Sequence, residues 1–205
     1  MKFYNSTGPN PHVVRMFMAE KGLDIPVQQV DLMKGENRQP PFNQKINVSG
    51  QLPALELDDG SVICEIIAIC EYLEEIAPEP SLIGTTAEER AETRMWTRRI
   101  DLNIVEPLGG GFRAAEGRAI FESRFRLIRA EAADDLKAIA RDKILWLDGL
   151  MEGKDYVCGD RFSLADILLF CFLIFGARVG QPMPAEVKHL PAWLERVKAR
   201  PSAAA

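Results

Sequence analysis

The residue types best suited to chemistry are few and lie far apart in the chain. Four cysteines stand at positions 64, 70, 158 and 171, without a Cys-x-x-Cys pair, and only two histidines accompany them. The ligand spacing of a zinc site is therefore missing, and we expect no bound metal. The run Gly109-Gly110-Gly111 lacks the Lys-Ser/Thr of a phosphate-binding loop, which argues against a nucleotide site. A polar loop, Ser6–Asn10, and an acidic helix start at Glu65 remain as candidates.

The first third of the chain alternates strand-like and helix-like segments that would position these candidates. Asn10 is a good N-cap and Pro11 suits a first helical position, while Asp59-Gly60 supplies the turn of a hairpin. The segment 35–45 is expected to be a loop with a short irregular helix. The predicted elements are strand Lys2–Asn5, helix Pro11–Gly22, strand Val27–Leu32, hairpin strands Ala54–Leu57 and Ser61–Cys64, and helix Glu65–Ile76.

After a Pro/Gly/Thr-rich linker at 78–87, only helical periodicity remains. Helices are expected over Glu88–Leu108, Ile120–Met151, Leu164–Val179 and Ala192–Arg200. Three successive glycines are too flexible for a helix interior, so Gly109–Gly111 is interpreted as a hinge or loop. Ser163 and Asp166 form a capping box and are interpreted as structural. The fold class is therefore α/β followed by all-α, with domains at 1–77 and 88–205.

Several motifs in this order resemble the cytosolic glutathione transferase family, of a bacterial type. They are Gly50-Gln51-Leu52-Pro53-Ala54-Leu55, the hairpin at Asp59-Gly60, Glu65 opening a helix that ends in Tyr72-Leu73, and Gly159-Asp160-Arg161-Phe162-Ser163-Leu164-Ala165-Asp166. The resemblance covers essentially the whole chain. It implies a thioredoxin-like N-terminal domain that binds glutathione and a helical-bundle C-terminal domain that lines the site of an electrophile.

The resemblance also implies roles for residues around the expected glutathione site. Pro53 would be the family's cis-proline, and the Leu52 backbone would pair with the cysteinyl backbone of glutathione. Glu65 would bind the γ-glutamyl ammonium, and the neighbouring helix amides its carboxylate. Ile66 stands where the family usually has Ser or Thr, so one hydroxyl contact is lost. Further candidate ligands are Gln51 for backbone or carboxylate groups of glutathione, and Lys34 and Arg38 for its glycine carboxylate. Asp101 matches a position that reaches the γ-glutamyl amine of glutathione in a neighbouring subunit.

The residue that would stabilise the glutathione thiolate lies in the first loop according to the resemblance. Asn10 falls where one bacterial class has its Cys, and another class uses an Asn after Pro, as in Pro9-Asn10 here. An Asn amide can donate a hydrogen bond to the thiolate but cannot act as a base. Ser6 and Thr7 are the hydroxyl alternatives, and plain helix capping is the alternative role of Asn10. Phe112 and Arg113 are candidate walls of an electrophile site between the domains.

Charge and cysteine usage set the expected partners and location. The formal net charge is -5, and residues 1–77 hold 6 basic and 11 acidic side chains, so the excess lies in the first domain. The sequence has no stripe of basic residues, which argues against nucleic acid as a partner. Free thiols and the absence of a signal pattern favour a soluble cytoplasmic protein, and the resemblance implies a homodimer. The expected activity is conjugation of glutathione to an apolar electrophile; the alternatives are a non-catalytic ligand-binding or interaction module and a glutathione-dependent disulfide or peroxide reductase.

Overall fold

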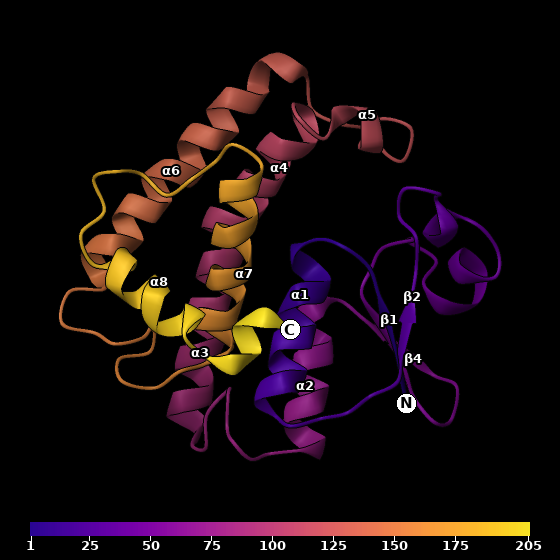
Figure 1. The fold of residues 1–205 in the computed structure, drawn as a ribbon, viewed down its shortest axis with the longest axis horizontal. Helices are drawn as coiled ribbons and strands as arrows, with labels where there is room; N and C mark the ends of the chain where they lie inside the picture. Colours follow the sequence, from indigo (N-terminus) through magenta and orange to yellow (C-terminus); the bar gives the residue numbers. More distant parts are fainter. The chain divides into compact units, whose positions relative to one another are not determined.

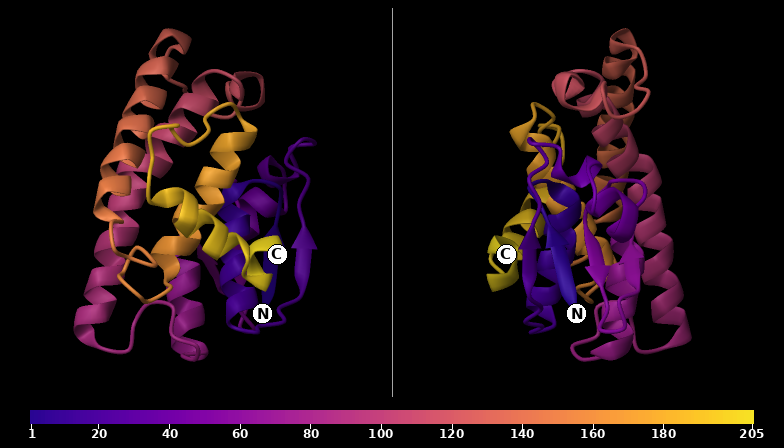
Figure 2. Two further views of the ribbon diagram at one scale, coloured as in Figure 1. Left: turned by 60° about the vertical axis from the view of Figure 1, so that its left-hand side comes forward. Right: turned by 90° about the vertical axis from the view of Figure 1, so that its right-hand side faces the viewer.

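A computed structural model describes all residues from Met1 to Ala205, and the chain forms two compact units. Unit 1 comprises Met1–Leu82 together with Pro201–Ala205, and unit 2 comprises Ile83–Arg200. Figures 1 and 2 show the strands confined to unit 1 and a purely helical unit 2. The expected succession of an α/β part and an all-helical part is therefore confirmed.

Unit 1 is built on a four-stranded mixed sheet in the order β2-β1-β3-β4. The strands are β1 (Lys2–Asn5), β2 (Val27–Gln29), β3 (Ala54–Glu56) and β4 (Val62–Cys64). β1 and β2 are parallel, as a crossover through a helix requires, and β3 is antiparallel to both β1 and β4. Gly60 takes a φ of 83° in the turn between β3 and β4, so the Asp-Gly hairpin prediction is confirmed. β2 ends three residues earlier than expected.

Two layers cover the sheet. Helices α1 (Pro9–Glu20) and α2 (Ile66–Ile76) lie together on one face (Figure 1). The main core of the unit includes side chains that are fully buried: Phe3, Phe17, Leu55, Ile69 and Leu73. A smaller cluster of Val30, Phe42 and Leu52 packs with Tyr4, Leu32 and Ile46. This second cluster involves the short helical turns η1 (Glu36–Arg38) and η2 (Phe42–Ile46), where an irregular segment was expected.

The start of α1 differs from the prediction. The helix begins at Pro9, Gly8 occupies the N-cap position with φ 118°, and no side chain caps this end. Asn10 is thus the second helical residue and not the N-cap. The reason is that Pro9 is pre-set for a first helical position, while Gly8 can take the positive φ that leads into it.

The last residues of the chain belong to unit 1. The turn η5 (Pro201–Ala204) packs against α1, and the Ser202 hydroxyl donates a hydrogen bond to the Glu20 carboxylate. Unit 1 is therefore assembled from both ends of the sequence.

Unit 2 is organised around α7 (Leu164–Arg178), whose residues are buried along most of its length. Around it lie α3 (Ala87–Ile100), α4 (Glu106–Ala114), α5 (Arg118–Phe121), α6 (Ala133–Leu150) and α8 (Leu190–Lys198). None of the helices combines the length and apolar character needed to cross a membrane. The helix expected over Ile120–Met151 is wrong in its first part, because residues 122–129 are turns and coil before η4 (Ala130–Ala132) begins.

The hinge predicted at Gly109–Gly111 is also wrong, because all three glycines lie inside α4. α3, the π-helical turn η3 (Asp101–Val105) and α4 follow one another without a break. Glycine is needed here for close packing against α6: a Cβ on Gly110 would lie 2.9 Å from Leu136 Cδ1, and one on Gly111 2.8 Å from Lys137 Cγ. The glycines thus give α4 a flat face for its neighbour.

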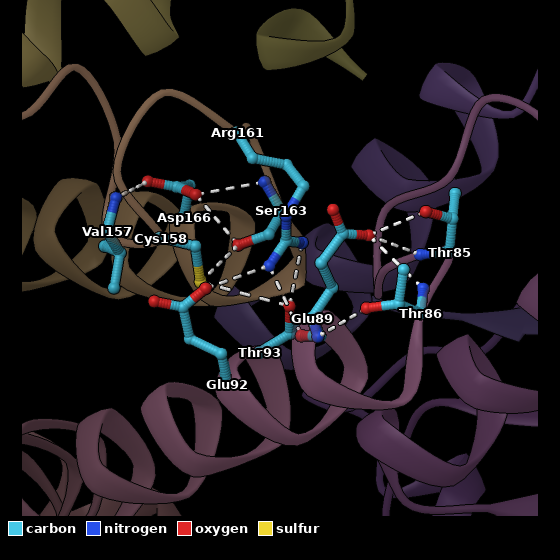
Figure 3. A network of polar contacts seen from close by, with 10 residues as sticks. All are labelled: Thr85, Thr86, Glu89, Glu92, Thr93, Val157, Cys158, Arg161, Ser163 and Asp166. Atoms are coloured by element: carbon cyan, nitrogen blue, oxygen red, sulfur yellow. Dashed lines mark hydrogen bonds and ion pairs between the residues drawn. The ribbon is translucent and has the colours of Figure 1, made fainter.

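A polar network holds the start of α7 to α3 (Figure 3). The Asp166 carboxylate accepts hydrogen bonds from the amide and hydroxyl of Ser163, both at 3.0 Å, and from Trp193 Nε1 at 2.9 Å. The predicted capping box is therefore present, and its structural role is confirmed. Burial raises the pKa of Asp166 to about 6. Arg161 donates to Thr93 Oγ1 at 2.9 Å and so ties the loop before α7 to α3.

Candidate functional site

The strand register of unit 1 brings the predicted glutathione-site segments to one end of the sheet. Ala54 pairs with Tyr4 on one side and with Cys64 on the other. The loop after β1, the Leu52-Pro53 bond before β3 and Glu65 after β4 therefore leave the sheet at the same end. α1 and α2 both begin there, because each follows directly on one of these strands. We call this region the sheet-end site.

The Leu52-Pro53 peptide bond is cis, as the resemblance implied. Leu52 is 8 % exposed and its side chain belongs to the smaller cluster, whereas Gln51 beside it is exposed. Their backbone stands next to the first residue of β3. The role of these residues in binding remains a proposal.

Glu65 has an uncommon backbone conformation. It is the N-cap of α2, its φ is 71° and its ψ 127°, and it is the only residue other than glycine with a positive φ. Such a conformation costs on the order of 1–3 kcal/mol in a residue with a side chain and tends to occur at functional positions. The Glu65 side chain is exposed at the helix start. Burial, together with the Glu65 charge, raises the pKa of the neighbouring Cys64 thiol, so Cys64 is poorly suited to act as a nucleophile.

The two helix starts at the sheet-end site offer different numbers of amide donors. The first three amides of α2, from Ile66 onward, have no partner within the helix. In α1 the corresponding positions are Pro9, Asn10 and Pro11, and proline has no N–H group. The single free amide at the start of α1 is therefore that of Asn10. The start of α2 is suited to a carboxylate, while α1 presents one amide beside a side chain that can also donate.

The three first-loop candidates differ in exposure. Thr7 and Asn10 are exposed, whereas Ser6 is 5 % exposed. Arg15 of α1 holds the start of the loop, because its Nη1 donates to Asn5 Oδ1 at 2.7 Å and to the Ser6 carbonyl at 3.4 Å. Thr7 and Asn10 therefore present the more accessible donors.

Asparagine side chains hold the turn that leads into Gln51, a feature that sequence reasoning missed. Asn37 is 2 % exposed and donates to the Gly50 carbonyl at 2.5 Å. Asn47 donates to the Gln51 carbonyl at 3.1 Å and accepts from the Ser49 amide at 3.0 Å. Gly50, with φ 61°, passes so close that a Cβ there would lie 2.8 Å from the Asn37 carbonyl oxygen. The density of Asn and Gly between 37 and 50 was the available signal for an ordered turn.

The two cationic candidates of unit 1 have different environments. Arg38 donates from Nη1 to the Ser49 carbonyl at 2.9 Å, which places its guanidinium against the same turn as Gln51. Lys34 is more exposed, and its Nζ lies 3.4 Å from the Asp31 carboxylate. Arg38 therefore contacts the turn that leads into Gln51, whereas Lys34 is connected with the sheet-end site only by its position after β2.

The three candidates in unit 2 have partners of their own. Asp101 begins η3 and accepts from Arg98 Nη1 at 2.9 Å. The Phe112 ring meets those of Phe175 and Phe121, with centroids 5.0 and 6.0 Å away. Arg113 is 3.5 Å from the Glu106 carboxylate.

The fold and the sheet-end site define a protein with a thioredoxin-like unit and a separate helical unit. Family models for the glutathione S-transferase N-terminal domain and C-terminal domain match residues 7–76 and 120–201. The chain belongs to the glutathione S-transferase family.

Individual relatives agree with this assignment. Glutathione S-transferase 2 of Saccharomyces cerevisiae is 36 % identical over 201 residues, which cover 95 % of this chain and 84 % of that protein. A maleylacetoacetate isomerase of Pseudomonas aeruginosa is 39 % identical over 191 residues, covering 89 % and 83 %. The crystal structure of a glutathione S-transferase domain-containing protein of Marinobacter aquaeolei has a TM-score of 0.91 at 34 % identity, covering 98 % of this chain and 99 % of that one.

Proposed function

We propose that this protein is a glutathione transferase that binds glutathione at the sheet-end site, favours its thiolate form and conjugates it to an apolar electrophile. The observation that carries the proposal is the convergence of four features at one sheet end. They are the loop Ser6–Asn10, the Leu52 backbone, Glu65 and the free amides of α2. Together they match the ammonium, carboxylates, peptide backbone and thiol of one tripeptide.

Each end of glutathione has a counterpart of opposite charge. Glu65 would bind the γ-glutamyl ammonium, and the α2 amides beginning at Ile66 its carboxylate. The Leu52 backbone would pair with the cysteinyl residue, with Gln51 beside it. Arg38 and Lys34 would attract the glycine carboxylate. These local contacts outweigh the acidic balance of residues 1–77, because charges within hydrogen-bonding distance act far more strongly than the screened net charge.

Asn10 would stabilise the thiolate by donating hydrogen bonds. A free thiol has a pKa of about 8.5, and a hydrogen bond to a charged acceptor contributes about 1.5–3 kcal/mol. One such bond lowers the thiol pKa by about one to two units, so that about a quarter to three quarters of the thiol is ionised at pH 7. The proton leaves to solvent, because an amide is not a base. The backbone N–H and the side-chain amide of Asn10 are both available for this role, since Gly8 and not Asn10 is the N-cap of α1.

The thiolate would then attack an electrophilic carbon of the second substrate. Phe112 and its aromatic neighbours offer apolar surface for that substrate, with Arg113 beside them. Most of the rate enhancement would come from proximity and from the higher thiolate concentration.

A non-catalytic binding module is the second candidate. Ile66 stands where a hydroxyl would add a contact to glutathione, and no tyrosine or cysteine lies in the loop 6–10. A glutathione-dependent disulfide or peroxide reductase, with glutathione itself as the nucleophile, is the third.

The first test is binding of glutathione by calorimetry, followed by the pH dependence of thiolate absorbance in the complex. We expect Asn10→Ala to raise the pKa of the bound thiol by about one unit and to slow conjugation at pH 7 by about three- to eightfold, in proportion to the lost thiolate. S-methylglutathione, which has no thiol, should bind both proteins equally. Full thiolate formation in Asn10→Ala would clear Asn10 and shift the role to Ser6 or Thr7. Binding with an unshifted thiol in the wild type would favour the binding module.

We further propose a cytoplasmic homodimer. The four cysteines are all free thiols, which a reducing compartment preserves. In a dimer, Asp101 would reach the γ-glutamyl amine of glutathione in the neighbouring subunit. Light scattering after size-exclusion chromatography measures the oligomeric state, and Asp101→Asn should weaken glutathione binding if that contact exists.

A further inference from the structure

Side chains hold three successive backbone carbonyls in the turn before the cis-proline. Each carbonyl accepts a hydrogen bond from a different side chain: Ser49 from Arg38 Nη1 at 2.9 Å, Gly50 from Asn37 Nδ2 at 2.5 Å, and Gln51 from Asn47 Nδ2 at 3.1 Å. The series ends at Leu52, whose backbone amide and carbonyl make no hydrogen bond within the chain. The turn is therefore held up to the residue whose backbone is left open.

Asn37 reaches this turn from a segment thirteen positions earlier. It lies on η1, is 2 % exposed, and its backbone packs directly on Gly50, where a Cβ would lie 2.8 Å from the Asn37 carbonyl oxygen. Gly50 is buried as well, so its carbonyl needs a partner from the protein. Asn47, by contrast, belongs to the turn itself, because its Oδ1 accepts from the amide and the hydroxyl of Ser49 at 3.0 and 2.8 Å. Asn37 is therefore a buried tie between η1 and the turn.

The satisfaction of buried polar groups does not by itself account for Asn37. The Oδ1 atom of Asn37 is buried and has no hydrogen-bond partner, which is unfavourable for folding. An apolar side chain in its place would remove this unpaired oxygen and leave the Gly50 carbonyl unpaired instead. The chain has one unpaired buried acceptor in either case. What Asn37 adds is a fixed position for the Gly50 carbonyl.

We propose that Asn37 is a positioning residue for glutathione, which holds the Gly50 carbonyl and thereby fixes the backbone of Leu52 beside the cis bond. This inference rests on the proposed function, in which Leu52 pairs with the cysteinyl backbone. Strand-like pairing requires the N–H and C=O groups of Leu52 to be correctly placed. Because the turn is already held in the free protein, glutathione does not have to order it on binding, and the affinity is correspondingly higher.

The affinity for S-methylglutathione, measured by calorimetry, tests this role without the thiol. We expect Asn37→Ala to raise Kd about tenfold, because the ligand must then order the turn. Asn37→Asp keeps the shape of the side chain, but a carboxylate cannot donate to the Gly50 carbonyl, so this variant should bind at least as weakly.

Asn43→Ala is the matched control. Asn43 lies in the neighbouring turn η2, and its Oδ1 is also buried without a partner. Its Nδ2 donates to the Arg38 carbonyl at 2.6 Å, and not to a carbonyl of the turn 49–51. The substitution therefore removes a similar side-chain hydrogen bond and leaves the tie to Gly50 in place. We expect its Kd to stay within about twofold of the wild-type value.

Steady-state kinetics separates positioning from a loss of folded protein. In Asn37→Ala we expect KM for glutathione to rise about tenfold, and kcat at saturating glutathione to stay within about twofold. A defect of folding alone would reduce the fraction of active enzyme, which lowers kcat and leaves KM unchanged. Circular dichroism and Tm establish that each variant is folded at the temperature of the assay.

Amide hydrogen exchange of the free protein tests the hold on the turn directly. The Gly50 amide donates to the Asn47 carbonyl at 2.8 Å, so its exchange reports opening of the turn. In a peptide spanning residues 47–52, we expect exchange to be at least about tenfold faster in Asn37→Ala and unchanged in Asn43→Ala.

The outcomes separate this inference from the function on which it rests. If Asn37→Ala binds S-methylglutathione as tightly as the wild type does, or if Asn43→Ala weakens binding equally, the positioning role is wrong and the proposed function stands. Weaker binding without faster exchange also overturns the role, because the effect would not pass through the turn. If the wild type binds neither glutathione nor S-methylglutathione, the proposed function fails and the positioning role fails with it.

Discussion

Replacing Gly111 by alanine tests whether the glycines of α4 serve close packing. An exposed Gly→Ala change in a helix gains about 1 kcal/mol of stability from propensity alone. At Gly111 the new Cβ would lie 2.8 Å from Lys137 Cγ and 3.3 Å from the Ala133 carbonyl oxygen, and a backbone atom cannot move aside alone. Overpacking of this kind costs about 1–3 kcal/mol. We therefore expect Gly111→Ala to lower the free energy of unfolding by about 1 kcal/mol.

Gly149→Ala in α6 is the matched control, because nothing lies within 4 Å of its added Cβ. We expect it to raise stability by up to about 1 kcal/mol, so the two variants should differ by about 2 kcal/mol. For a chain of this size, that difference corresponds to about 4–8 °C in Tm.

Urea unfolding followed by tryptophan fluorescence is the suitable assay, since all three tryptophans, Trp96, Trp146 and Trp193, lie in unit 2. Equal stabilisation by both substitutions would refute the packing explanation and restore the interpretation of Gly109–Gly111 as a flexible element.

Two further predictions concern single acidic residues. Burial raises the pKa of Asp166 to about 6, against about 3.9 in an unfolded chain. The protonation of Asp166 therefore stabilises the folded state below pH about 4. This stabilisation, of up to about 3 kcal/mol, is lost as the pH rises through about 6. Urea titrations between pH 4 and 7 should show that the free energy of unfolding of Asp166→Asn does not fall in this way. An equal fall in the wild type and the variant would contradict the prediction. Glu65→Gly should stabilise the protein by about 1 kcal/mol, because glycine tolerates the positive φ, and should weaken glutathione binding at least about tenfold in calorimetry. Unchanged affinity would remove Glu65 from the site.

The sequence predicted those parts of the fold that are determined by residues close together in the chain. Asp59-Gly60 determines the hairpin by its own backbone preferences, and Glu65 directly follows that hairpin. The capping box of Ser163 and Asp166 spans only one helical turn. These features could be recognised without knowledge of the tertiary structure.

Two of the errors and omissions concern residues whose role depends on a partner distant in the sequence, and one concerns a residue overruled by its neighbours. Gly111 looked like a helix breaker because α6, against which it packs, is formed by residues 133–150. Asn37 holds the Gly50 carbonyl across thirteen positions, and no spacing rule links the two. Asn10 was expected to cap α1 because Asn is a good cap, but Pro9 and Gly8 together start the helix earlier. The partners of Gly111 and Asn37 are distant in the sequence, whereas the capping preference of Asn10 was overruled by the two residues before it.

The contribution of Pro201–Ala204 to unit 1 has a consequence for the order of events during synthesis. The ribosome completes the sheet, α1 and α2 first, then all of unit 2, and only afterwards the turn that packs against α1. Domains that fold during synthesis generally do so from the N-terminus onward. In unit 1, by contrast, more than a hundred residues of unit 2 must be synthesised before Ser202 can contact Glu20. The nascent thioredoxin-like unit therefore exposes part of α1 throughout that interval, and this part of α1 is covered only after residues 201–204 have been synthesised.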